Sequence, residues 1–595
     1  MRRITAGVVL AAGLFSGSSV ALHAQEAETV VDPAALTDQT SLPDAIERKG
    51  ARPAADAGAL PPAADTLDEQ LEALAAPPQL ALPDQVDQVR IKELRPITLE
   101  EAQQIAEVNS PRLKAAANQV EQAKASLRAA LSSWYPTIDL QANGLPQYFK
   151  SYTYRNPDFV PDRFVERSTG QVNPLTGEEI TRQVRRDGKP ETYGREWRAD
   201  VNVQVSWDLI NPARVPQIAA ARDSYERVRD SYLIALRDLR LQSAAAYFEL
   251  QEADEGVRIG QASVRSSLVS LRDARARYNA GVNTKLEVLE QETQLARDRD
   301  LLTDRLASQA ISRRRMAQLL GFPQDVTPTA ATPATPLGLW EPSLQESILA
   351  AYDYREELDQ LVLDISISNS QANAALAAVQ PVISLVNTTS ASRNEGQTNR
   401  NSIGAIDMDD YRWGVQNATA LTARWRLFDG GQARAEYRRF KLAAEESANN
   451  FAGARDQIRL EVEESFVGLR SAIQSIETTS SEVLSSRESL RLSQLRVQAG
   501  VSTQREVVDN QRDLTNAELR YAQAIRRYNT SLAQLRRRTG LDALVACPAS
   551  SLPSQKPVSD SVEMPIEPTP LNAACMAAST KGQTEEQSKP IQPLW

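Results

Sequence analysis

The feature that most constrains this chain is a turn-like segment that occurs twice. The first copy runs from Arg277 to Val288 and the second from Arg496 to Val507; they share Arg, Ala, Gly, Val, Thr, Glu and Val. The shift between their glycines is 500 − 281 = 219 residues. Self-similarity of this kind, at one fixed offset, indicates an internally duplicated protein.

Each copy has the chemistry of one helix that ends and another that begins. In the first copy Gly281 can take the left-handed conformation that ends a helix, and Thr284 can cap the next one, with Glu287 completing a capping box. In the second copy the same roles fall to Gly500, Thr503 and Glu506. Helical periodicity continues on both sides, so each turn is predicted to be the tip of a long antiparallel helical hairpin.

The rest of the chain repeats in the same order. Pro381 corresponds to Pro136 with a shift of 245 residues, whereas Trp425 corresponds to Trp207 with a shift of 218. The difference falls between paired strands, so the second polar loop is about 27 residues shorter than the first (245 − 218). Exposed loops tolerate such length changes, while helices on either side keep their register.

Charge and residue types exclude several classes of function. The net charge of −10 leaves no basic field for a nucleic-acid partner. The only histidine, His23, lies in a segment that fits a secretory signal cleaved after Ala24, so the mature chain is expected to lack histidine chemistry. Cys547 and Cys575 lie in a Pro/Ser-rich tail, where an exported location permits a disulfide but no spacing requires one.

Composition and periodicity predict the division of the chain. The first ordered helix is expected to begin at a capping box, Thr98 with Glu101, and to run to about Trp134. A second begins after Pro212 and continues to Tyr278, which is roughly 100 Å at 1.5 Å per residue. The predicted segments are a signal peptide (1–24), a disordered Ala/Pro-rich lead-in (25–95) that has room for one short helix around residues 66–74, a first repeat (96–322), a linker (323–341), a second repeat (342–540) and a flexible C-terminal tail (541–595).

Four strands with one apolar and one polar face are predicted. They lie near Thr137–Leu145, Ala199–Leu209, Val382–Ser392 and Tyr411–Phe428. The pattern fits a half-buried soluble sheet or an outer-membrane barrel with an apolar outside and a polar lumen. Four strands cannot close around a lumen, and unpaired edges cost several kcal/mol per group in hydrocarbon. A membrane barrel would therefore need other copies of the chain.

At this point the chain resembles the TolC family of outer-membrane channel proteins. The resemblance covers about residues 96–540 and is carried by Ile97 to Ala102, Tyr278 to Gly281, Trp425 to Gly431 and Gln498 to Val501. It implies a mainly α fold with membrane β: duplicated helical hairpins form an α-helical barrel, and four strands per protomer contribute to a 12-stranded trimeric β-barrel. The implied location is the cell outer membrane, in contact with its lipid, with the helical part in the periplasm.

The resemblance also implies a function and a set of site residues. The homotrimer would be the passive exit duct of a tripartite efflux pump or type I secretion system, opened by a periplasmic adaptor (membrane fusion) protein and an inner-membrane transporter. The implied adaptor-contact tips are Ala280, Gly281, Val282, Ala499, Gly500 and Val501, and the implied periplasmic gate acids are Glu506, Asp509, Glu287 and Glu290. Ser502 stands where a family member has a latching arginine, so a different latch is expected, with Arg505 and Lys285 as alternatives.

Purely structural roles stay open for these residues. Glu287 and Glu506 can be capping residues only, Asp509 and Glu290 can belong to a solvated helix face, and any helix turn favours glycine. For the whole chain, the alternative is a periplasmic coiled-coil scaffold without transport activity. No Gly-rich phosphate loop, nucleophile elbow or metal-ligand cluster is found, so no enzyme and no cofactor are predicted. The cargo stays open among drugs, proteins, polysaccharides and metals.

Overall fold

The structure is a computed structural model. It describes residues 61–546 apart from 65, 69, 155, 157–162, 187–190, 283 and 399–407. The predicted signal peptide, the first part of the lead-in, both cysteines and the tail beyond Ala546 lie outside the described residues.

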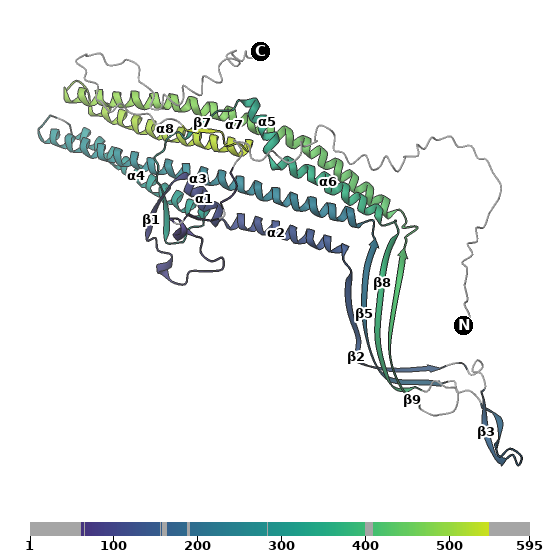
Figure 1. Ribbon diagram of the computed structural model, residues 1–595. Helices are drawn as coiled ribbons and strands as arrows, with labels where there is room; N and C mark the ends of the chain where they lie inside the picture. The colour runs from purple at the N-terminus through teal and green to yellow at the C-terminus, as the bar shows by residue number, and fades with distance from the viewer. Residues whose placement is uncertain are drawn as a thin grey trace, which may run out of the picture. The chain divides into compact units, whose positions relative to one another are not determined.

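Two long helical hairpins dominate the described chain (Figure 1). The first consists of α3 (Arg214–Asn279) and α4 (Lys285–Leu320), and the second of α7 (Gln432–Gln498) and α8 (Gln504–Thr539). The outgoing helices have 66 and 67 residues and the returning helices 36 each, so the two repeats match closely. Within the described residues, no helix combines the length and apolar character needed to cross a membrane.

Each repeat opens with two helices rather than the single helix predicted. In the first repeat α1 (Leu99–Asn109) ends at Ser110, and α2 (Pro111–Leu131) begins with the proline, which has no N–H to continue the helix. In the second repeat α5 (Leu344–Tyr354) and α6 (Glu356–Ala377) meet at Arg355. The predicted capping boxes at both starts are confirmed, with side-chain and backbone bonds in both directions.

The four predicted strands form one antiparallel sheet; the first three are longer than expected, whereas the fourth begins three residues earlier than predicted and ends at Arg424 instead of Phe428. They are β2 (Thr137–Tyr154), β5 (Glu191–Ile210), β8 (Val382–Thr398) and β9 (Met408–Arg424), hydrogen-bonded in the order β2-β5-β8-β9 (Figure 1). The first polar loop is partly a further hairpin, β3 (Arg163–Val172) with β4 (Glu179–Arg186). Both faces of these two strands are mostly polar. The alternation of apolar and polar residues that marks a strand is therefore missing, and the sequence did not reveal them.

Two small sheets each join the segment before one repeat's helices to the segment after them. A parallel pair joins β1 (Glu93–Ile97) to β6 (Val326–Ala330), and an antiparallel pair joins β7 (Gly338–Trp340) to β10 (Leu544–Ala546). The predicted linker and the first residues of the predicted tail are therefore ordered. Their backbone groups find partners far away in the sequence, which local composition cannot show.

The last part of the lead-in is also ordered, and over more residues than the one short helix expected near residues 66–74. A short 3-10 helix, η2 (Glu72–Leu74), places Leu71 and Leu74 in the main apolar cluster, together with side chains of α1, α3 and α4. Asn109 fixes the chain beside it, since its side-chain amide donates to Leu74 O at 2.8 Å and accepts from Ala76 N at 3.0 Å. Burial of the two leucines stabilises this segment, although its Ala/Pro-rich composition favours disorder.

Candidate functional site

The four-stranded sheet has two faces of different chemistry. Strand register places Ile138 opposite Val205, and Leu385 opposite both Trp207 and Leu421, on one face. Because side chains alternate along a strand, the neighbouring residues form the other face. That polar face carries Thr137, Asp139, Gln141, Asn202, Gln204, Ser206, Ser384, Thr388, Ser390, Gln416 and Thr422. One apolar and one polar face is the pattern of a wall between lipid and a water-filled lumen.

The apolar face is interrupted by one polar cluster on β8 and β9. Asn387 Nδ2 donates to Thr419 Oγ1 at 2.7 Å, and Asn417 Nδ2 donates to Thr389 Oγ1 at 2.6 Å. The two amides also bond to each other, at 3.2 and 3.3 Å. The four side chains therefore satisfy much of their hydrogen-bonding capacity within the cluster.

The two edges of the sheet have no strand partner among the described residues. β2 and β9 each pair on one side only, with β5 and β8 respectively. Since all three pairings are antiparallel, β2 and β9 run in opposite directions. The β9 edge of one copy can therefore pair with the β2 edge of another in the same antiparallel manner.

Both hairpin tips end their first helix in the same way. Gly281 and Gly500 have φ of 74° and 73°, where a side chain is disfavoured, and a Cβ at either would meet nothing within 4 Å. Backbone conformation alone thus requires glycine. Val282 N donates to Arg277 O at 3.0 Å, and Gly281 N to Tyr278 O at 2.9 Å, which is the Schellman pattern; the second tip repeats it.

Comparison with known proteins identifies this arrangement. A family model described as Outer membrane efflux protein matches residues 171–322 and 350–541, more than half of the chain. The chain belongs to the outer membrane efflux protein family. The predicted resemblance, the fold class and the outer-membrane location with periplasmic helices are thereby confirmed. Among curated proteins, none matches this sequence.

Solved channel structures share the fold. CusC is 17% identical, with 78% of this chain and 95% of CusC covered and a TM-score of 0.56. VceC of Vibrio cholerae is 16% identical, with 74% of this chain and 96% of VceC covered and a TM-score of 0.54. MtrE of Neisseria gonorrhoeae, solved in its open state, is 18% identical, with 74% of this chain and 88% of MtrE covered and a TM-score of 0.54. Identities this low establish similarity of fold.

In this efflux-family chain the tip residues that sequence implied are exposed, but the tip capping boxes are absent. Val282 and Val501 are 74% and 70% exposed. Thr284 and Thr503 do occupy the N-cap positions, yet neither makes a side-chain capping bond, which corrects the prediction.

Glu506 is bound to other side chains instead. Arg496 Nη1 lies 2.8 Å from one of its oxygens, and Ser502 Oγ donates to the other. Both carboxylate oxygens of Glu506 therefore have side-chain partners other than the expected cap.

The remaining gate acids are not brought into contact with Glu506. Asp509 lies 3.6 Å from Arg512, in an exposed pair one helical turn apart. Glu287 and Glu290 form no ion pair with a described residue, and neither does Arg505 or Lys285, the residues considered for a latch. Within one protomer the acids are thus separate groups near the tips.

Sequence reasoning missed the contact that joins the two tips. Arg277 Nη1 donates to Val497 O at 3.2 Å, across 220 residues of sequence. Arg277 is the repeat equivalent of Arg496, which pairs with Glu506 within its own tip. The sequence did mark this residue, because an arginine is the first residue that both copies of the turn share. The repeat could not show that the two arginines have different partners.

A buried polar layer lies behind the tips. Asp298 on α4 is buried and accepts from Gln294 Nε2 at 2.9 Å and from Ser267 Oγ on α3. The two hairpins meet through Ser266 Oγ, which donates to Gln511 on α8 at 2.8 Å. Hydrogen bonds thus join α3 to α4 within the first hairpin and α3 to α8 between the hairpins, beside buried apolar side chains such as Leu271 and Leu295.

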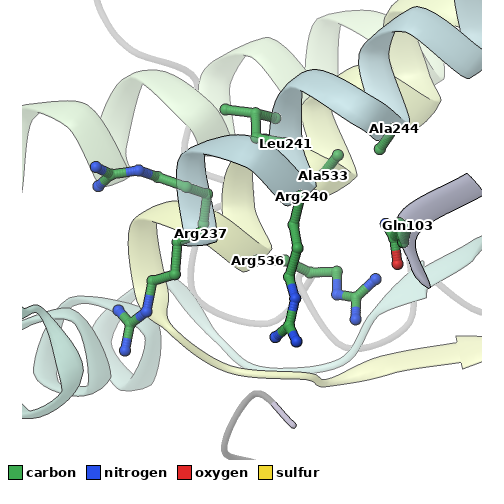
Figure 2. A pocket seen from close by; sticks show the side chains of 8 residues that line it. Gln103, Arg237, Arg240, Leu241, Ala244, Ala533 and Arg536 are labelled. Atoms are coloured by element: carbon green, nitrogen blue, oxygen red, sulfur yellow. The ribbon is translucent and has the colours of Figure 1, made fainter. Parts of the chain in front are cut away.

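A cavity between α1, α3 and α8 is lined with arginines, as Figure 2 shows. Each arginine has a carboxylate partner. Arg237 pairs with Glu356 at 2.6 Å, Arg240 with Glu107 at 2.6 Å, Arg536 with Asp542 at 2.9 Å and Arg537 with Asp238 at 2.7 Å. The cavity thus lies where α3 of the first repeat meets α8 of the second, and each of its arginines is ion-paired. The described residues also contain no group of three or more acids, cysteines or histidines placed to hold a metal ion.

Proposed function

We propose that three copies of this efflux-family chain close into a 12-stranded barrel, continued by a helical tunnel. The assembly serves as the passive exit duct of a tripartite efflux pump or type I secretion system. A periplasmic adaptor and an inner-membrane transporter open it and supply the driving force.

The observation that carries the proposal is the pair of free edges on a sheet with one apolar face. Four strands are too few to enclose a lumen, and open edges are not tolerated in hydrocarbon. β2 and β9 run in opposite directions, so copies can join edge to edge with the same antiparallel pairing that exists inside each copy.

The tips support the proposed role of the adaptor. Ala280–Val282 and Ala499–Val501 are held in one fixed conformation by the Schellman bonds, and their valines project into solvent. A rigid turn with an exposed apolar side chain is suited to protein recognition, since little conformational entropy is lost on binding.

The acids next to the tips support a gate. Glu506 and Asp509 lie three positions apart on α8 and hence on one face of the helix. Three copies would repeat this face around the axis as rings of carboxylates that favour cations. Glu287 and Glu290 occupy the equivalent positions on α4 and would extend these rings.

Reconstitution tests the duct and the gate separately. The detergent-extracted protein is expected to have the mass of a trimer by light scattering and to conduct ions in planar bilayers. A Glu506→Ala, Asp509→Ala double variant is expected to change conductance and lower cation selectivity. Glu436→Ala is the control, because that glutamate forms a similar exposed pair with Arg439 at the start of α7, at the opposite end of the helix from the tip.

Each outcome has a clear meaning. A monomer that conducts nothing would refute the duct, and release into the soluble fraction by alkaline extraction would favour the periplasmic scaffold instead. A conducting trimer whose selectivity is unchanged in the double variant would keep the duct but remove these two acids from the gate.

A further inference from the structure

Residues 77–92, which we name the apolar arm, leave the body of the protein between two anchors. At one end Ala76 N donates to the side chain of Asn109 at 3.0 Å. At the other end Lys92 N donates to Asp325 O at 2.8 Å, where β1 begins its pairing with β6. Figure 1 shows the purple chain beside β1 as a loop that stands away from the helices.

The arm and the strand that follows it expose an unusual number of large apolar side chains. Leu80, Leu82, Val86, Val89 and Ile91 are between 48% and 96% exposed. The hydrogen bonds described for residues 77–91 join residues no more than four apart, such as Asp84 N to Gln88 Oε1. A segment that is fixed at both ends, yet buries so little of its own apolar surface, is typical of an interaction surface.

The arm lies on one particular flank of the protomer. Helix packing follows the order α2, α3, α6, α7, which parallels the strand order β2, β5, β8, β9. The arm leads into β1 and α1, and α1 packs on α3 and α4 of the first repeat. It therefore belongs to the flank that contains β2, while α5 and α7 belong to the flank that contains β9.

The opposite flank carries a matching apolar surface. Leu460 and Val467 are seven residues apart on α7, and hence on one face of that helix, and both are about half or more exposed, at 49% and 69%. Leu349 on α5, which packs against α7, is 64% exposed. When copies join through β9 and β2 in a head-to-tail ring, the first flank of one copy meets the second flank of the next.

We propose that the apolar arm docks on the α5–α7 flank of a second copy of this chain and clamps neighbouring protomers together below the sheet. The proposal rests on the trimer of the proposed function. It adds a protein contact outside the membrane to the strand pairing within it. Both surfaces are apolar and the arm has no net charge between residues 77 and 92, with Asp84 and Asp87 balanced by Arg90 and Lys92. Apolar burial is therefore the expected attraction.

A triple variant of the full-length chain, Leu80→Ser with Leu82→Ser and Val86→Ser, tests the clamp. The detergent-solubilised trimer is expected to dissociate at a protein concentration at least tenfold higher than that of the unmodified chain, with unchanged helical content by circular dichroism. Leu175→Ser is the matched control, because Leu175 is 94% exposed but lies between β3 and β4. Equal dissociation of the triple variant and the unmodified chain would overturn the proposal.

Labelling provides a second measurement that does not depend on weakening the trimer. With Cys547 and Cys575 replaced by serine, Leu82→Cys is expected to react with a maleimide at least tenfold more slowly in the trimer than in the dissociated chain. Equal rates would show that the arm is free in the trimer and would overturn the clamp. A chain that is monomeric before any substitution would instead refute the proposed function itself.

Discussion

Glu357 joins two helices of the second repeat and offers a quantitative test of the fold. Its carboxylate lies 3.0 Å from Arg355 Nη2 and 2.7 Å from Arg537 Nη1, so it links the start of α6 to the end of α8. Burial by itself would raise the pKa of Glu357, but the hydrogen bond from Arg355 and the charges of Arg537 and Arg355 outweigh it. Together they lower the pKa from 4.5 to about 2.

This pKa difference sets the expected size and sign of the effect. A fall from 4.5 to about 2 corresponds to about 3 kcal/mol in favour of the folded protein when the carboxyl is ionised. Because the folded pKa is the lower one, the contribution is present above pH 4.5 and is lost as the pH falls toward 2.

The perturbation is Glu357→Gln, since glutamine has the shape of the protonated carboxyl without its charge. At pH 7 the variant is expected to unfold in denaturant with about 3 kcal/mol less free energy than the unmodified protein, as followed by helical circular dichroism in detergent. At pH 3 much of this difference should disappear. Glu463→Gln is the control, because that glutamate forms an exposed pair with Arg459, and its loss should have little effect. A destabilisation that is the same at both pH values would refute the reasoning.

Three further predictions concern the tips and the core. Arg277→Ala removes the hydrogen bond to Val497 O and is expected to raise the open probability in planar bilayers; unchanged gating would exclude this contact as a latch. Gly500→Ala places a side chain at φ 73° and should cost about 1 kcal/mol, measured as amide exchange that is roughly fivefold faster around the second tip. Tyr247→Phe removes a bond of 3.1 Å to Ile97 O and should lower the free energy of unfolding by about 1 kcal/mol, while an unaltered denaturation midpoint would contradict its role.

The long hairpins were predictable because their determinants are local. Periodicity fixed the helices, and Gly281 and Gly500 fixed the tips, where the structure has the left-handed conformation. The predicted helix after Pro212 agrees with α3 to within a few residues at either end. By contrast, the break at Ser110 depends on a single proline within a continuing helical pattern, which periodicity does not resolve.

What could not be predicted depends on contacts between distant residues. The pairing of β1 with β6 and the burial of Leu71 and Leu74 require surfaces that the helices create only after folding. The same holds for Glu506, whose sequence context favours a capping box. Its actual partner, Arg496, is positioned by the preceding helix. The local sequence thus singled out Glu506 but did not predict its ion pair with Arg496.

The polar cluster on the apolar face of the sheet restricts how this wall can change over time. Because Asn387, Thr389, Asn417 and Thr419 bond mainly to one another, replacing one of them by an apolar residue leaves another stranded in hydrocarbon. Replacing all four together would leave no such orphan. Each single substitution therefore lowers stability, although the fully apolar combination need not. The cluster can be retained in evolution for this reason alone, without a role in transport.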